Sequence, residues 1–214
     1  MKKLRLFILI AAILPAGKTL SQSPDRDLKT FVTSDHTHGL PYEKAMSYGS
    51  ENTPELIAMF KDSKYEFSRN NIALMLGIIG DSRAFPELKT YLHEQRGEIS
   101  AVSFNTLFSV FQAMGHLARK GNHDALVLLE HWSEPKNREL LALQLSYKNF
   151  NNPAMNILLN RLAIQGLAMS GKDEAFTYLE KLSHSDNLNY REYLKSDLKN
   201  AMELNRKIKT EGST

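Results

Sequence analysis

Three segments of the sequence share a pattern in which a glycine is followed four residues later by an alanine and, after four more, by a leucine. They read GDSRAFPELKTYL from Gly80, GNHDALVLLEHW from Gly121 and GKDEAFTYLEKL from Gly171, and a weaker copy, GSENTPELIAMF, begins at Gly49. Glycine ends a helix in the left-handed conformation at the lowest cost, and apolar residues three and four apart follow one helix face. The pattern predicts a helix, a sharp turn and a second helix, repeated along the chain.

The residues before each turn predict how the helices pack. Each predicted first helix carries another glycine, at Gly77, Gly115 or Gly166. Small residues let neighbouring helices approach to about 8 Å, so we expect stacked antiparallel helix pairs. The interval between the second and third copies is longer than the preceding one, and the breaker Pro135 within it precedes an added helix predicted at about residues 137–147.

The segment LGIIGDSRAFPEL, residues 76–88, resembles a HEAT repeat of the subtype first noted in phycobilisome lyases. In that subtype a helix ending L-G-x-x-G-D is followed by a small residue, an apolar residue, Pro and x-Leu. The resemblance extends over about residues 42–182. It implies an all-α fold, an α-solenoid of four to five stacked helix pairs over residues 41–208, which a final amphipathic helix closes.

The N-terminus has the three parts of a secretory signal peptide. Lys2, Lys3 and Arg5 precede the apolar run LFILIAAIL, and small and polar residues follow. The run is shorter than the roughly 20 residues that span a bilayer, so we expect residues 1–21 to be cleaved ahead of Gln22. The mature protein is then periplasmic or secreted, with no membrane span. Residues 22–40 are predicted as a polar arm, and residues 209–214 as a C-terminal tail.

Charge and composition exclude several classes of function. Residues 1–21 hold four basic and no acidic residues, so the formal net charge of +3 becomes −1 without them. A mature chain without a block of Lys and Arg lacks the positive surface that nucleic acid requires. The chain has no cysteine, which excludes disulfides, thiolate metal sites and cysteine nucleophiles.

Two local motifs resemble ligand sites, and the sequence favours neither. GLAMSGKD, residues 166–173, resembles a phosphate-binding loop, but Asp173 stands where such loops need Ser or Thr, and the repeat already explains both glycines. His36 and His38 beside Asp35 could hold zinc or copper. A lone His-x-His in a polar segment is more often solvated. We therefore predict no catalytic, cofactor or metal site.

The HEAT resemblance implies a scaffold or adaptor that binds a protein or peptide, without catalysis of its own. The alternatives are an enzyme related to the HEAT-type bilin lyases, or a regulatory subunit of an envelope enzyme complex. In such solenoids the second helix of each pair lines the concave face, and stepping 100° per residue from its buried leucine gives the exposed positions. The predicted partner-binding residues, polar and of mixed charge, are Lys61, Lys89, Thr90, His93, Glu130, His131, Glu134, Glu180, Lys181 and His184.

Overall fold

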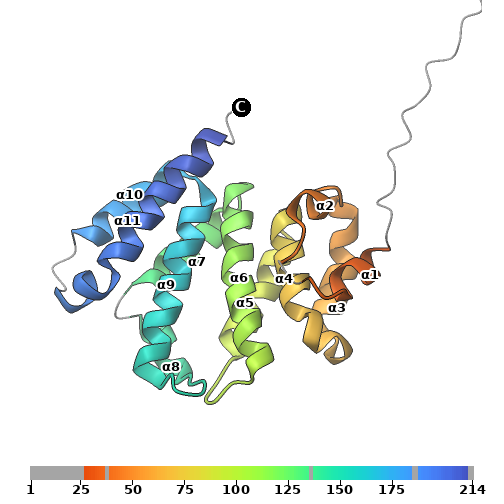
Figure 1. Ribbon diagram of the computed structural model, residues 1–214, viewed down its shortest axis with the longest axis horizontal. Coiled ribbons are helices and arrows are strands. Elements are labelled where there is room, and N and C mark those ends of the chain that lie inside the picture. The colour runs from red at the N-terminus through yellow and green to blue at the C-terminus, as the bar shows by residue number, and fades with distance from the viewer. Residues whose placement is uncertain (1–26, 37–38, 135–136, 185–187, 212–214) are drawn as a thin grey trace, which may run out of the picture.

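The computed structural model describes residues 27–36, 39–134, 137–184 and 188–211, and in these ranges the protein is all-α, as predicted (Figure 1). Two isolated bridges, Glu98 with Ser146 and Tyr147 with Phe150, are the β-type pairings in the described residues. The helices are α1 Leu28–Thr33, α2 Tyr42–Met46, α3 Thr53–Lys61, α4 Arg69–Ile79, α5 Ala84–Glu94, α6 Ala101–Arg119, α7 His123–Ser133, α8 Arg138–Leu143, α9 Asn152–Ser170, α10 Asp173–Ser183 and α11 Leu188–Glu211.

The larger helices form two rows. Helices α4, α6, α9 and α11, here called the A row, pack side by side in that order. Helices α3, α5, α7 and α10, here called the B row, pack against them: α3 on α4, α5 on α6, α7 on α6 and α9, and α10 on α9 and α11 (Figure 1). None of the described helices is both long enough and apolar enough to cross a membrane.

The predicted turns lie at the repeat glycines. Gly80 and Gly171 end α4 and α9 in the left-handed conformation, with φ of +78° and +62°. Gly121, with φ of +100°, directly follows Lys120, the C-cap residue of α6. After it, the side chain of Asn122 accepts a hydrogen bond of 2.9 Å from the amide of Ala125 and caps α7. A helix end and a helix start are thus joined within a few residues.

The second set of glycines brings the A-row helices into backbone contact. An ideal Cβ placed on Gly77 of α4 would lie 2.3 Å from the Cα of Ala113 in α6. One placed on Gly115 of α6 would lie 2.6 Å from the carbonyl oxygen of Gly166 in α9. Real Cβ atoms do not approach so closely, so α4, α6 and α9 pack at a distance that requires glycine. The packing role predicted for these residues is confirmed.

The core lies between the two rows. The leucines that define the repeat, Leu56, Leu88, Leu129 and Leu179, are at most 1% exposed. Trp132 of α7 is fully buried, and its ring contacts that of Phe111. Each B-row helix therefore turns its repeat leucine toward the A row.

Asparagine side chains tie the ends of helices to later helices in the chain. In each case the amide nitrogen donates to a main-chain carbonyl in or next to the last turn of an earlier helix, where carbonyls lack the usual main-chain partners. The donor and acceptor residues are Asn71 and Val32 (3.1 Å), Asn160 and Trp132 (2.7 Å), and Asn205 and Leu167 (3.2 Å). The carbonyl of Leu167 also accepts from the Ser170 hydroxyl of its own helix (2.7 Å). The ends of α1, α7 and α9 are thus bonded by side chains of α4, α9 and α11.

The structure differs from the sequence-based prediction in three segments. The arm predicted at residues 22–40 contains α1, whose Leu28, Phe31 and Val32 are buried, because three apolar residues at helical spacing suffice to pack against α4. The added helix, α8, ends at Leu143 because Gln144 adopts the left-handed conformation. Helix α11 continues to Glu211, into the predicted tail. The predicted signal peptide lies outside the described residues.

Candidate functional site

The predicted partner-binding residues lie along the B row and differ in exposure. Seven side chains are exposed: Lys61, Lys89, Thr90, His131, Glu180, Lys181 and His184. Three are partly buried: His93, Glu130 and Glu134. The surface is polar and carries both signs of charge, whereas the partly buried members take part in contacts between neighbouring B-row helices.

His93 packs between α5 and α7 rather than on the outer face predicted for it. Its ring meets that of Trp132 edge to face, with 5.6 Å between ring centroids. Its Nε2 atom is buried and has no hydrogen-bond partner among the described residues. Burial lowers the pKa of His93, so the imidazole is neutral at neutral pH. The physical reason for the difference is that the Trp132 ring of α7 lies against the His93 side of α5.

Glu134 and Glu130 join α7 to α10. The hydroxyl of Tyr178 in α10 donates to the Oε1 atom of Glu134 (2.6 Å) and to the carbonyl of Glu130 (3.0 Å). Burial, and then the bond to Glu134, raise the pKa of Tyr178. Burial also raises the pKa of the Glu130 side chain. These two predicted contact residues therefore hold neighbouring helices together.

A pocket of about 410 Å³ opens between α3, the start of α4, and α5. Two predicted residues, Lys61 and Thr90, line it. The remaining lining residues, which the sequence reasoning did not assign to a site, are Phe60, Arg69, Glu87, Tyr91, Glu94 and Gln95. The sequence prediction did not include Arg69, because it considered the second helix of each pair, whereas Arg69 is the first residue of α4, a first helix.

Two cationic side chains line the pocket, and they differ in their partners. The Nζ atom of Lys61 lies 3.0 Å from the Oε2 atom of Glu87. The Nε atom of Arg69 donates to the carbonyl of Phe60 (3.0 Å), and its guanidinium carbon lies 5.8 Å from the centre of the Tyr91 ring. Tyr91 is 8% exposed, and its hydroxyl is buried without a hydrogen-bond partner in the described parts of the chain.

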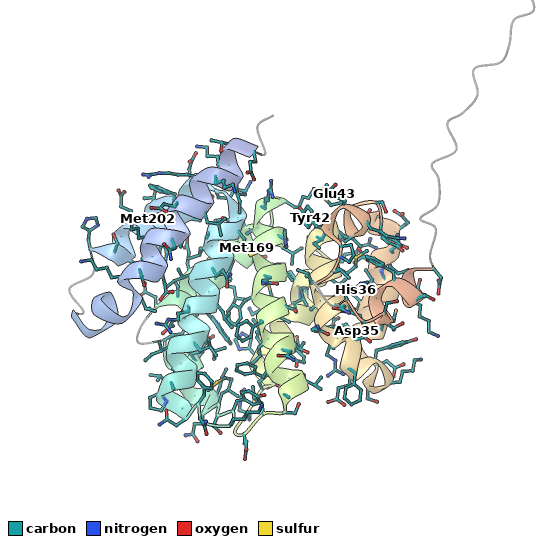
Figure 2. All side chains as sticks on the ribbon, in the orientation of Figure 1. Asp35, His36, Tyr42, Glu43, Met169 and Met202 are labelled. Carbon is teal, nitrogen blue, oxygen red and sulfur yellow. The ribbon has the colours of Figure 1, made fainter. Side chains whose placement is uncertain are left out.

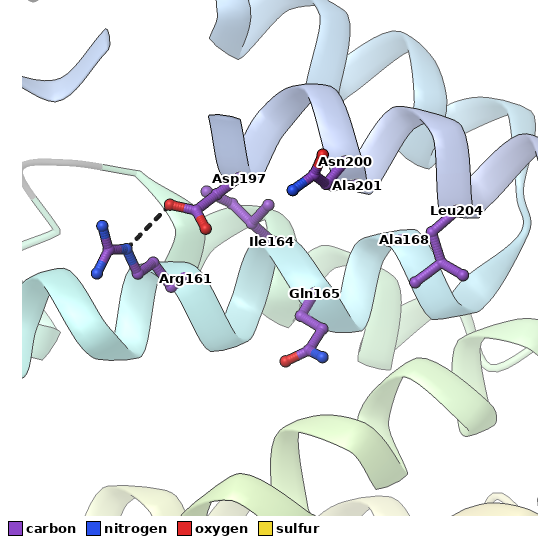
Figure 3. A pocket seen from close by; sticks show the side chains of 8 residues that line it. All are labelled: Arg161, Ile164, Gln165, Ala168, Asp197, Asn200, Ala201 and Leu204. Atoms are coloured by element: carbon purple, nitrogen blue, oxygen red, sulfur yellow. Dashed lines mark hydrogen bonds and ion pairs between the residues drawn. The ribbon is translucent and has the colours of Figure 1, made fainter. Parts of the chain in front are cut away.

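A smaller pocket of about 270 Å³ lies between α9 and α11 of the A row (Figure 3). Arg161 and Asp197 form an ion pair at 3.0 Å at one side of it. Ile164, Ala168 and Leu204 contribute apolar surface. None of the predicted partner-binding residues lines this pocket.

One candidate ligand motif lies partly outside the described residues, and the other forms a turn between two helices. His36, labelled in Figure 2, has its Nε2 atom 2.8 Å from the carbonyl oxygen of Phe31, and His38 lies outside the described residues. No group of three or more His, Asp or Glu side chains in the described ranges is placed to hold a metal ion. The segment that resembles a phosphate-binding loop, residues 166–173, forms the end of α9 and the turn to α10, with Gly171 as the cap of α9.

The chain was compared with protein-family models, with curated proteins and with solved structures, and none of the three comparisons found a match.

Proposed function

We propose that this protein is an exported scaffold or adaptor of the HEAT-repeat type, which binds a protein or peptide partner on the outer face of the B row. The observation that carries the proposal is that each B-row helix has one buried apolar side and one exposed polar side. One side buries a repeat leucine, and the other presents polar side chains of both charges, such as Lys89, Glu180 and Lys181.

The two-row packing supports the solenoid assignment. Helix pairs α4–α5, α6–α7 and α9–α10 each join an A-row helix to a B-row helix across a turn, and successive A-row helices pack on one another. In a HEAT-type solenoid the second helices line the concave face, which here would be the B row. Repeat solenoids bind along such a face because successive repeats present an extended surface.

The chemistry of the B-row face favours a protein or peptide over nucleic acid or lipid. Positive and negative side chains both occur on it, as in the salt bridge of Lys61 with Glu87. Phosphate backbones require a concentration of Lys and Arg. A lipid surface requires a contiguous apolar face. Protein interfaces are enriched in aromatic and arginine side chains. The pocket on the B row is lined by the buried Tyr91 and the partly buried Arg69.

Site-specific photocrosslinking in the native host tests the proposal. A photoreactive amino acid at Thr90 should give a discrete covalent adduct with a partner, because Thr90 is exposed on the B row. The same residue at Lys199, exposed on α11 of the A row, is the control. An adduct that forms equally well at both positions, or solely at Lys199, would contradict the proposed face.

Charge reversal tests the same face quantitatively once the partner is purified. Lys89→Glu, Glu180→Lys and Lys181→Glu together should weaken binding, while the circular dichroism spectrum and the melting temperature stay unchanged, because all three side chains are exposed. The matched control carries Lys195→Glu, Lys199→Glu and Glu203→Lys on α11, where the same kinds of change fall on the A row. Equal loss in both triple variants would mean that total charge, not the B-row face, governs binding.

Export is part of the proposal and rests on residues 1–21. The mature protein purified from its host should begin near Gln22, which an intact-mass measurement decides. Recovery of the full-length chain with Met1 from the cytosol would refute it.

A further inference from the structure

We infer that the pocket between α3 and α5 receives an acidic side chain, an Asp or Glu, of the bound peptide. The inference rests on the proposed function and specifies the chemistry of one subsite on the B-row face. Its grounds are an arginine with free terminal nitrogens, a buried hydroxyl without a partner, and the balance of charge around them.

The Arg69 side chain is held in place by its Nε atom, and its two terminal nitrogens are available to a ligand. The bond from its Nε atom to the carbonyl of Phe60 (3.0 Å) fixes the side chain, and the Tyr91 ring lies beside the guanidinium. No described residue accepts a hydrogen bond from either terminal nitrogen. A guanidinium presents parallel N–H groups that match the two oxygens of a carboxylate. Because Arg69 is partly buried, such a pair is screened less than one on an open surface.

The hydroxyl of Tyr91 supplies the second observation. A buried hydroxyl without a partner is unfavourable, because it has lost its bonds to water and gained none in return. A carboxylate accepts from hydroxyls and has room for more than one donor. Since the hydroxyl is shielded from water, a ligand reaches it after a neighbouring side chain moves. Among the residues that line the pocket, the Lys61 side chain is 60% exposed, and an exposed side chain changes its rotamer at low cost.

The surrounding charges favour a carboxylate over a phosphate. Lys61 and Glu87 neutralise each other at 3.0 Å, which leaves Arg69 and Glu94 as the other charged side chains of the lining. Arg69 and Glu94 are likewise of opposite charge, so the lining carries no net charge. A carboxylate adds one negative charge beside Arg69, whereas a phosphate adds nearly two at neutral pH beside the carboxylates of Glu87 and Glu94. Glu94, which is exposed, is free to accept an N–H group from the same peptide.

The size of the pocket fits one side chain with its adjoining main chain. About 410 Å³ lies at the lower end of the range for small-molecule sites. Such a volume cannot hold a folded domain. The rest of a partner would therefore extend over α5, α7 and α10, and the acidic side chain would fix its register on the B row.

An NMR titration of the 15N-labelled protein tests the inference. The probes are N-acetyl-glutamate N-methylamide, its glutamine counterpart, and N-acetyl-phosphoserine N-methylamide. The glutamate probe should shift the Arg69 Nε–H resonance and the amides of Tyr91 and Gln95 in a saturable manner, and the glutamine probe should bind at least tenfold more weakly. Equal binding of both amino-acid probes would overturn the inference, and so would tighter binding of phosphoserine.

Two variants assign the response to the pocket. Arg69→Lys should weaken glutamate binding about tenfold, because an ammonium cannot form the two parallel bonds. The matched control is Arg206→Lys, since Arg206 also lies over an aromatic ring, that of Phe176 at 4.5 Å, outside the pocket. Tyr91→Phe should weaken binding several-fold while the protein stays folded. Equal effects of the two arginine variants would refute the pocket assignment.

The outcomes separate this inference from the proposed function. A purified partner whose binding is lost on charge reversal at Lys89, Glu180 and Lys181, but is unaffected by Arg69→Lys, would leave the B-row face as the binding surface. The acidic subsite alone would then be wrong.

Discussion

Replacing Gly77 by alanine should destabilise the protein, although alanine is the better helix former. The added Cβ would lie 2.3 Å from the Cα of Ala113, 2.7 Å from its Cβ and 2.8 Å from its carbonyl oxygen. Ordinary contacts of this kind begin at 3.4 Å, so α4 and α6 would have to separate by about 1 Å. Two of the three obstructing atoms are main-chain atoms, which no rotamer change can move.

The magnitude follows from two opposing effects. Overpacking a close-packed core costs about 1 to 3 kcal/mol. The higher helix propensity of alanine stabilises the folded protein by about 0.5 to 1 kcal/mol relative to glycine. Because the clash is with main-chain atoms, we expect a cost in the upper half of the overpacking range, about 2 to 3 kcal/mol. The net loss in the free energy of unfolding is then about 1 to 2.5 kcal/mol, which is a fall of roughly 2 to 10 °C in melting temperature for a chain of this size. Gly77→Leu should cost more.

Urea denaturation followed by far-ultraviolet circular dichroism measures the loss, and an unchanged dependence on urea shows that the folded state is still compact. A second variant, Gly77→Ala with Ala113→Gly, is the control. It removes the Cβ of Ala113 but leaves the main-chain clash, so it should not restore stability. A midpoint that rises for Gly77→Ala, or a full rescue by the double variant, would refute close backbone packing of α4 and α6.

Three further predictions concern buried polar groups. Tyr91→Phe should raise the free energy of unfolding by roughly 1 kcal/mol, because it removes an unpartnered hydroxyl, whereas Tyr178→Phe should lower it, because that hydroxyl has two acceptors. Asn160→Ala should cost about 1 to 3 kcal/mol by leaving the carbonyl of Trp132 without its donor, as urea denaturation can measure. Burial, with Arg119 and Lys120 nearby, lowers the pKa of His116 from 6.5 to about 4. Since the unfolded chain takes up this proton first, stability should fall from about pH 6.5 to pH 4 by up to ~1.4 kcal/mol per pH unit, and His116→Gln should remove that slope.

The repeat turns could be predicted because they depend on local backbone chemistry. A glycine in the left-handed conformation and a leucine eight residues on are read from one stretch of sequence, and Gly80, Gly121 and Gly171 have the expected positive φ. The buried leucines followed from the same spacing. Helix α1 escaped prediction because its six residues are too few for periodicity to stand out from the polar segment around it.

The candidate site was less predictable because it depends on which helices become neighbours. Stepping from Leu88 locates the side of α5 that faces the A row, but it gives no information on what lies at its flanks. The sequence therefore predicted His93 on the outer face, although its ring packs against that of Trp132 in α7. The pocket is lined by Lys61, Arg69 and Tyr91 from three helices. It depends on the contact between α3 and α5, which the spacing of residues within one repeat does not predict.

The asparagine bonds between helices set an order for completing the fold. The end of α1 is satisfied by α4, that of α7 by α9 and that of α9 by α11, so each acceptor precedes its donor along the chain. As the polypeptide emerges from the ribosome, the helix end is made before the helix that carries its asparagine donor. A chain that stops before α11 lacks Asn205, and the carbonyl of Leu167 then keeps the Ser170 hydroxyl as its donor but loses the bond to α11. Premature truncation should therefore loosen α9 as well as remove the final helix, which would expose an incomplete chain to proteolysis from its last intact pair.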